Sequence, residues 1–452
     1  MIDYILKLRF EENPDKDFLN INNENVTYEQ LHKLAEEIAD SFDSKKNINR
    51  IKLNFNSKKL LLASIFAINR LNKIPIIFPP KEQMLKNINY DSLAKIDLEL
   101  NDNNCIIQRK YKKVKIYKYN KDNVQCALFT TGSSSGAPLC VELTFENIYC
   151  SSVNWSKIYK FSKQDIYLNI LPIFHVAGLS IFFRSLYSDF YVVYKNYNKN
   201  NLHMDLTNCK ATCLSIVPKM FNDITAKNKG LAVLQSLQFI ILGGDSMTSD
   251  IFKKCSDNNI KIYASYGLTE SSSGVAGFWV NQEKEYLQGF IGYPHFDTKI
   301  FVKNGNIVIK SKTIMKKYSS GEDTQGIYVS SDRGKLVGDK ICFVGRNKDF
   351  IVSGGENINI KNIEDLLKKP AFDKEVILVS YKDDKWGEVP VVIYESKEES
   401  IDYINKILSC CKKNLPKYMI PKYFISIKNI PRYDNLKVDY FKLNQYVRKN
   451  FK

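Results

Sequence analysis

The segment of this chain best suited to chemistry is the run Thr-Thr-Gly-Ser-Ser-Ser-Gly at residues 130–136. The apolar run Cys126–Phe129, which is typical of a buried strand, precedes it. No side chain in the loop is large enough to cover its amides, so backbone N–H groups and hydroxyls can converge on an anion, most usefully a polyphosphate. A solvated Ser/Gly linker has the same composition, and the loop alone favours the two interpretations equally. It is not a Walker loop, because only three residues separate Gly132 from Gly136 and no Lys follows.

A second candidate region is the apolar stretch of residues 172–186, which contains one histidine and one arginine. His175 follows a strand and lies in a turn bounded by Pro and Gly. A histidine beside aromatic residues is more often a core residue than a catalyst, although a loop position raises the share of functional cases. Arg184 lies on a predicted helix among large apolar side chains, where a cation needs a partner such as a substrate carboxylate. The alternative is that its guanidinium reaches the surface.

Two apolar runs that read as strands, residues 237–242 and 260–265, each end in a glycine-containing turn. Gly243 and Gly244 follow the first, and Tyr-Gly-Leu-Thr-Glu at 266–270 follows the second. In parallel α/β sheets, ligands bind at the edge where the carboxyl ends of the strands meet, so we expect a site there. Ser246 lacks the second glycine of a nucleophile elbow, and the chain has only four histidines, which argues against a hydrolase triad.

The elements that must position these residues follow an α/β rhythm. Thr27 and Gln30 predict a capping box, and β-rich runs then alternate with helical ones. Asn304-Gly305 between alternating apolar residues predicts a type I′ hairpin, and hence a change to antiparallel β from about residue 285. We predict an α/β protein: a large N-terminal domain, residues 1–347, with parallel α/β subdomains and a small β-barrel-like subdomain, and a smaller α+β C-terminal domain, residues 348–452.

Composition restricts the class of protein. The chain has 452 residues, 44% hydrophobic and 25% charged, as in ordinary soluble globular proteins of two or more domains. The longest clean apolar run, Leu60–Ile68, is far too short to span a membrane, and the N-terminus lacks a signal-peptide cleavage pattern, so we expect a cytoplasmic or organelle-stroma protein. Ten cysteines without a CxxC pair predict reduced thiols rather than zinc or disulfides. The net charge of +17 is compatible with nucleic-acid binding, with codon bias or with attraction of nucleotide phosphates, but the lysines form no patch.

These motifs, in this order, resemble the AMP-forming acyl-CoA synthetase (adenylate-forming ligase) superfamily over roughly residues 125–440. The resemblance implies a mobile C-terminal domain and an acid–thiol ligase that uses a small carboxylic acid, ATP, Mg²⁺ and coenzyme A, with no nucleic acid and no membrane span. A carboxylate is a poor electrophile, and its attack on the ATP α-phosphate creates an acyl-adenylate with a good leaving group. Mg²⁺ and a lysine would stabilise the phosphate charge. Thiol attack then needs a different lining, which a hinged domain can supply.

For the ATP site, the resemblance implies roles for residues in four motifs. They are a phosphate-binding loop of Thr130, Thr131, Gly132, Ser133 and Ser134; an adenine-lining segment of Gly243, Gly244 and Asp245; Tyr266 stacked on adenine beside Gly267, with Thr269 at the α-phosphate and Glu270 on Mg²⁺; and Asp332 on the ribose hydroxyls beside Arg346.

For the reaction itself, the resemblance implies a catalytic set of Lys437, Glu270, Thr269 and His175. Lys437 lies six residues after Pro431, as does the lysine of the adenylation step. His175 and Arg184 are the candidates for binding the acid. Lys348 occupies the hinge position, and the loop for thioester formation includes Gly354, Gly355 and Glu356.

Within the superfamily, residues 171–186 and 212–221 resemble the o-succinylbenzoate–CoA ligase family of menaquinone and phylloquinone biosynthesis. Another aromatic or short-chain acid, a carrier-protein thiol in place of CoA, and a degenerate nucleotide-binding module are the alternatives. The chain departs from the superfamily pattern at three places: Leu139 replaces a Lys after the phosphate loop, Ser330-Ser331 replaces Thr-Gly before the ribose Asp, and Leu436 replaces the Gly before the catalytic Lys. The sequence does not indicate an oligomeric state.

Overall fold

The computed structural model describes two compact units. The first runs to Val329, apart from the hairpin segment Val302–Ile307, which belongs with the residues from Ser330 onward in the second unit. The predicted domain boundary and hinge at Lys348 stay predictions. The structure describes residues 2–42, 48–80, 84, 88–105, 120–130, 138–227, 229–353, 356–367, 372, 374–383, 387–434 and 436–451.

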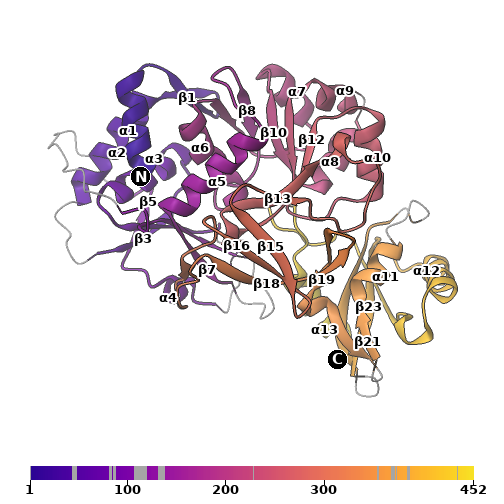
Figure 1. The fold of residues 1–452 in the computed structure, drawn as a ribbon. Coiled ribbons are helices and arrows are strands. Elements are labelled where there is room, and N and C mark those ends of the chain that lie inside the picture. Colours follow the sequence, from indigo (N-terminus) through magenta and orange to yellow (C-terminus); the bar gives the residue numbers. More distant parts are fainter. Residues whose placement is uncertain are drawn as a thin grey trace. The chain divides into compact units, whose positions relative to one another are not determined.

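The first unit contains a nine-stranded sheet with the order β14-β13-β12-β11-β10-β8-β9-β1-β2 (Figure 1). Strands β8 to β12 run parallel to their neighbours within that group, whereas β13 and β14 are antiparallel additions at one edge. The central strands are short apolar runs that are buried along their length, as strands covered on both faces should be. The bounds are β1 Asp17–Ile21, β2 Glu24–Thr27, β8 Ile166–Asn169, β9 Tyr191–Tyr194, β10 Cys213–Ile216, β11 Phe239–Leu242, β12 Ile262–Leu268, β13 Ser273–Trp279 and β14 Tyr293–Pro294.

A second sheet of the first unit has six strands in the order β17-β7-β6-β4-β3-β5. Strands β3 to β6 form its parallel part, and β7 turns back antiparallel to β6. The buried strand predicted before the Ser/Gly loop is therefore confirmed as β6. The bounds are β3 Arg50–Asn54, β4 Ile74–Ile77, β5 Leu98–Asn101, β6 Val124–Phe129, β7 Cys140–Thr144 and β17 Lys317–Tyr318.

The helices of the first unit form two groups that are visible in Figure 1. Helices α1, α2 and α3 pack together, and α7 to α10 pack together elsewhere, while α5 contacts both sheets and runs against α6. Helix α2 begins at the predicted capping box, in which Thr27 Oγ1 accepts from the N–H of Gln30 and Gln30 Oε1 accepts from the N–H of Thr27, both at 3.1 Å. The bounds are α1 Ile2–Glu12, α2 Tyr28–Phe42, α3 Lys58–Arg70, α4 Tyr90–Ala94, α5 Phe145–Ile158, α6 Val176–Ser188, α7 Leu202–Asn208, α8 Pro218–Thr225, α9 Gly230–Ser236, α10 Ser249–Asp257, and the short 3₁₀ helices η2 Thr269–Ser271 and η3 Val280–Gln282.

A four-stranded sheet, β15-β16-β18-β19, contains the predicted hairpin. Asn304 and Gly305 connect β15 to β16 with φ values of 53° and 78°, and positive φ at both central residues is what a type I′ turn requires. The division between the two compact units falls within these strands. The bounds are β15 Thr298–Lys303, β16 Asn306–Ser311, β18 Ile327–Val337 and β19 Lys340–Arg346.

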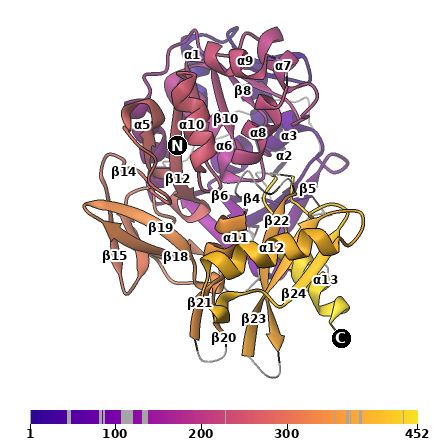
Figure 2. The same cartoon turned by 90° about the vertical axis from the view of Figure 1, so that its right-hand side faces the viewer.

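The second unit is built on the sheet β21-β20-β23-β22, with β24 beside β23. Side chains of β22 alternate between its faces: Leu378 packs in the core with α11 and α12, and Ile377 and Val379 pack in the core with α13. Figure 2 shows these three helices and the sheet as ribbons. The predicted smaller α+β part of the chain is thereby confirmed. The bounds are η4 Asn347–Asp349, β20 Phe350–Ser353, β21 Glu356–Asn359, α11 Ile360–Leu367, β22 Val376–Asp383, β23 Gly387–Glu395, α12 Ile401–Asn414, η5 Lys417–Met419, β24 Tyr423–Ile427 and α13 Tyr440–Asn450.

Two expectations from composition can be compared with the fold. All ten cysteines are free thiols, as predicted. Among the helices that the structure describes, none combines the length and the apolar character needed to cross a membrane.

Candidate active site

Two of the predicted site segments lie where parallel strands of the nine-stranded sheet end. His175 follows β8 and is the N-cap residue of α6, and Gly243 to Asp245 follow β11. The N–H of Gly243 donates to the carbonyl of Ile216 at the end of β10, 3.1 Å away, and Gly244 has a φ of +82°. Because the carboxyl ends of parallel strands share one edge, these segments lie at the same edge of the sheet.

The predicted turn at Tyr266 is wrong, because β12 continues to Leu268. Antiparallel pairing with β13 supplies the hydrogen bonds that keep the chain extended after the apolar run ends, with a bulge between Tyr266 and Gly267. The backbone passes so close at Gly267 that an added Cβ would lie 2.2 Å from the carbonyl oxygen of Ser273. The chain turns only at η2, which carries Thr269 and Glu270.

Glu270 presents a buried carboxylate that is held by two tyrosines. Tyr318 and Tyr328 both donate their hydroxyls to Glu270 Oε1, at 2.8 Å and 3.3 Å. Burial, followed by the neighbouring Glu270 carboxylate, raises the pKa of Tyr318, so this hydroxyl stays a neutral donor. Sequence reasoning missed both tyrosines, because they lie about fifty residues further along the chain and belong to no motif.

The predicted phosphate-binding loop connects β6 to β7. At its base, the N–H of Thr130 donates to the carbonyl of Leu139 at 2.9 Å. Thr131, Gly132, Ser133 and Ser134 lie outside the described residues, so their predicted role stays a prediction. Helix η2, with Thr269 and Glu270, packs against β7, which places these two residues on an element that contacts the strand following the loop.

Arg184 is buried, with 2% of its surface exposed, so the alternative that it reaches the surface is wrong. Its guanidinium carbon lies 4.7 Å from the centroid of the Trp155 ring. Its Nε and Nη1 atoms have no hydrogen-bond partner among the described residues. Burial lowers the pKa of Arg184, and nearby Tyr167 opposes that shift, but a guanidinium stays charged in proteins. A buried cation with two unused donors is unfavourable unless an anion binds it.

Arg184 is one of the residues that line a pocket between α5 and α6. Its wall combines apolar side chains with four serines and the arginine, and consists of Leu143, Ile148, Ser151, Ser152, Val176, Leu179, Ser180, Phe183, Arg184 and Ser272. The Ser151 hydroxyl donates to the carbonyl of Ser272 at 3.2 Å, which connects α5 to the end of η2. The lining is therefore mostly apolar, with Arg184 as its one charged residue.

The rings around Trp155, which contacts Arg184, are aromatic and uncharged. Trp155 lies edge-on to His295 and Tyr263, with ring centroids 5.2 Å and 5.8 Å away. Burial, and then the charge of Arg184, lowers the pKa of His295 to about 3, so this imidazole is neutral at physiological pH. Trp155 was not predicted, since its place on an amphipathic helix looks like ordinary core packing.

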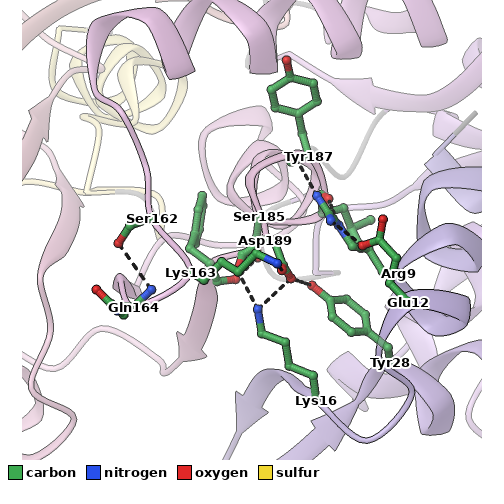
Figure 3. Close-up of polar contacts among 12 residues, drawn as sticks. Arg9, Glu12, Lys16, Tyr28, Ser162, Lys163, Gln164, Ser185, Tyr187 and Asp189 are labelled. Carbon is green, nitrogen blue, oxygen red and sulfur yellow. Dashed lines mark hydrogen bonds and ion pairs between the residues drawn. The ribbon is translucent and has the colours of Figure 1, made fainter.

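Helix α6 carries both His175 and Arg184, and its far end is fixed by the N-terminal segment (Figure 3). Arg9 donates to the last carbonyls of the helix, Leu186 at 2.9 Å from Nε and Tyr187 at 2.8 Å from Nη2. Asp189 follows in the left-handed conformation and accepts from the Tyr28 hydroxyl at 2.8 Å, and Lys16 Nζ lies 2.8 Å from the same carboxylate oxygen. These contacts fix the register of the helix that presents the two predicted acid-binding residues.

The remaining predicted residues belong to the second unit. Asp332 and Arg346 face each other across β18 and β19, with Arg346 Nε 3.1 Å from Asp332 Oδ1. Asp332 is buried and the Arg346 side chain is 41% exposed. Lys437 lies in a tight turn before α13, where its carbonyl accepts from the N–H of Tyr433 at 2.9 Å. Lys348 lies in η4 and Glu356 begins β21, whereas Gly354 and Gly355 fall outside the described residues.

The AMP-binding enzyme family model matches residues 80–319, more than half of the chain. The chain therefore belongs to the AMP-binding enzyme family. A relative named 2-succinylbenzoate–CoA ligase, from Staphylococcus epidermidis, is 26% identical over 459 aligned residues that cover 95% of each chain. Among solved structures, o-succinylbenzoate CoA synthetase (MenE) from Bacillus subtilis in complex with the acyl-adenylate intermediate OSB-AMP is 21% identical, with a TM-score of 0.82 over 97% of each chain. The same Bacillus enzyme in complex with ATP and magnesium ion is also 21% identical, with a TM-score of 0.82 over 97% of this chain and 99% of that one.

Proposed function

We propose that this protein is an ATP-dependent acid–CoA ligase that converts o-succinylbenzoate to its CoA thioester through an acyl-adenylate, as a cytoplasmic enzyme of menaquinone or phylloquinone biosynthesis. Family membership supports the reaction class. The observation that carries the choice of acid is Arg184, a buried cation that lines a mostly apolar pocket and has two donor atoms without a partner in the described part of the chain. A relative that matches 95% of the chain carries the name of this activity.

o-Succinylbenzoate supplies an anionic group to pair with the buried cation of the pocket. o-Succinylbenzoate is an aromatic dicarboxylate, so one carboxylate can react while the other is left to be recognised. In the proposal, the planar fork of Arg184 binds the unreacted carboxylate, and the apolar wall covers the ring. His175 lies at the start of the same helix and borders the reacting end of the acid.

In the first half-reaction, a carboxylate oxygen of the acid attacks the α-phosphorus of ATP and pyrophosphate leaves. Asp332 accepts the ribose hydroxyls, Tyr266 stacks on adenine, and Thr269 donates to the α-phosphate. The Lys437 ammonium stabilises negative charge that develops on the phosphates. In the second half-reaction, the CoA thiol attacks the acyl carbon and AMP leaves, with Lys348 as the hinge and the loop of Gly354, Gly355 and Glu356 turned toward the site.

The donors present fit a magnesium ion that arrives with ATP. The described residues contain no cluster of three His, Cys, Asp or Glu side chains that could hold a metal ion alone. Mg²⁺ usually takes one or two carboxylates together with substrate phosphates and water, and the buried carboxylate of Glu270 offers such a ligand. When bound, the ion would neutralise charge on the transferring phosphates.

The test is acid-dependent exchange of pyrophosphate into ATP, measured on the purified protein across a panel of acids. The proposal predicts exchange with o-succinylbenzoate well above exchange with benzoate or short-chain monoacids. Preference for a monoacid would overturn the choice of acid but keep the reaction class, and no exchange with any acid would indicate a nucleotide-binding module without turnover. Comparing free CoA with an acyl-carrier thiol as acceptor then separates the two kinds of ligase.

A further inference from the structure

The turn that carries Lys437 is fixed at both of its ends. The N–H of Asp439 donates to the carbonyl of Pro431 at 2.8 Å, and Arg432 and Val438 form an antiparallel bridge. Asp439 is buried and caps α13 by accepting from the N–H of Lys442 at 3.0 Å. The described residues on either side of Asn435 are therefore joined by hydrogen bonds at the start of α13.

The residue directly before Lys437 has an unfavourable backbone conformation. Leu436 has a φ of +60°, in the left-handed region that side chains with a Cβ rarely adopt. Its N–H donates to the carbonyl of Tyr433 at 2.8 Å. A leucine stays in this region only where surrounding contacts hold it there.

Arg432 supplies such a contact. One guanidinium nitrogen, Nη1, donates to the carbonyl of Leu436, and the other, Nη2, pairs with the carboxylate of Glu375. Glu375 directly precedes β22, and its carbonyl accepts from the N–H of Glu395 at the end of β23, 2.9 Å away. Glu395 in turn accepts from the N–H of Ile430 at 3.2 Å, at the start of the turn. Two adjacent strand ends thus hold the turn through acidic side chains.

We propose that Arg432 is a positioning residue for adenylation, which holds Leu436 in its left-handed conformation so that Lys437 is presented to the ATP phosphates. This inference rests on the proposed function of Lys437. The Arg432 and Glu375 side chains are 18% and 35% exposed, and a partly exposed ion pair by itself contributes little to stability. The effect of Arg432 comes instead from its fork, which joins an anchored carboxylate to the carbonyl beside the catalytic lysine.

The experiment measures the two half-reactions separately on the full-length protein: pyrophosphate exchange with o-succinylbenzoate, and thioester formation from supplied o-succinylbenzoyl-adenylate and CoA. A misplacement of about 1 Å can lower a rate by roughly 100-fold, and we expect Arg432→Ala to lower kcat for adenylation on that scale while KM for ATP and the thioester half-reaction stay close to wild type. Arg432→Lys, which keeps the charge but not the fork, should fall between the two. Lys449→Ala, which removes an exposed cation near the end of α13, is the matched control and should leave both half-reactions unchanged.

Leu436→Gly tests the clamp independently of folding. Glycine adopts a positive φ without strain, so the double variant Arg432→Ala with Leu436→Gly should regain part of the adenylation rate. The inference is overturned if Arg432→Ala behaves like the control, or if it slows both half-reactions equally. Lys437→Ala in the same assay tests the proposed function of the lysine separately. If Lys437→Ala adenylates normally, the proposed role of Lys437 is wrong. If Lys437→Ala loses adenylation but Arg432→Ala adenylates normally, only the proposed role of Arg432 is wrong.

Discussion

Replacing Arg184 with leucine should impair acid binding without lowering stability. Among the residues that the structure describes, Nε and Nη1 of the buried guanidinium have no hydrogen-bond partner, so its charge is poorly compensated. Exchanging buried charge for apolar volume is often neutral or stabilising by about 1–4 kcal/mol. The change also removes the contact with Trp155, which at a desolvated site is worth roughly 2 kcal/mol. We therefore expect the free energy of unfolding to be unchanged or slightly higher.

The loss of acid binding follows from the loss of the same two donor atoms. A hydrogen bond to a charged group contributes about 1.5–3 kcal/mol, so losing two costs about 3–6 kcal/mol. Since every 1.4 kcal/mol is tenfold, KM for a dicarboxylic acid should rise by at least about 100-fold. KM for ATP should change little, and a monoacid should bind as it does to the wild type, since neither meets the guanidinium in the proposal.

The assays are pyrophosphate exchange at varied acid and ATP, and urea unfolding monitored by tryptophan fluorescence. Arg184→Lys is the control, because it keeps a cation but loses the bidentate fork, and should recover part of the affinity. If Arg184→Leu lowers the free energy of unfolding by several kcal/mol and raises both KM values equally, then Arg184 is a structural residue and the carboxylate assignment is wrong.

Three further predictions test other parts of the account. Asp332→Ala should weaken ATP binding by about 2–4 kcal/mol, by isothermal titration, with a nearly unchanged melting temperature; the opposite pattern would make Asp332 a structural partner of its arginine. Lys437→Ala should lower the rate of adenylation by roughly 100- to 1,000-fold and leave thioester formation close to normal. Lys348→Pro should instead slow thioester formation more than adenylation, if a stiffened hinge favours the adenylating arrangement. Equal losses in both half-reactions would contradict domain alternation. His295 is buried and neutral, with a pKa of about 3 in the folded protein and 6.5 in the unfolded chain. The part of the folding stability that depends on this difference is fully present above pH 6.5 and is lost as the pH falls toward 3. Wild type should thus lose about 2–3 kcal/mol more than His295→Gln between pH 7 and 4.5 in urea unfolding, and equal losses would refute the buried neutral state.

Local signals predicted much of the fold. The capping box at Thr27 and Gln30 and the turn at Asn304-Gly305 are properties of a few adjacent residues, and both form as predicted. The parallel strands were also predictable, because buried strands are short apolar runs between turn residues. Local chemistry decides these elements before any tertiary contact is made.

Features that depend on distant partners could not be predicted. The extension of β12 through Tyr266 depends on pairing with β13, so the predicted turn begins about three residues later than expected, at Thr269. The support of Glu270 by Tyr318 comes from about fifty residues away. The left-handed φ of Leu436 runs against the preference of its own side chain, and its carbonyl accepts from Arg432, whose guanidinium also pairs with the distant Glu375.

For Arg184, the sequence left two possibilities open: a cation that needs a partner or one that reaches the surface. The fold decides between them, because α6 packs against α5 and β13 and turns the guanidinium inward. Burial, rather than residue type, is what makes this arginine informative about the ligand.

The central claim, that the chain joins a dicarboxylic aromatic acid to CoA through an adenylate, is tested most directly by identifying products. Purified protein is incubated with ATP, Mg²⁺, CoA and an equimolar mixture of o-succinylbenzoate, benzoate and a short-chain acid, and the products are identified by mass spectrometry. The account predicts o-succinylbenzoyl-CoA as the main thioester, formed together with equal amounts of AMP and pyrophosphate, and the o-succinylbenzoyl-adenylate when CoA is omitted. A different thioester as the main product, or ADP in place of AMP, would contradict it.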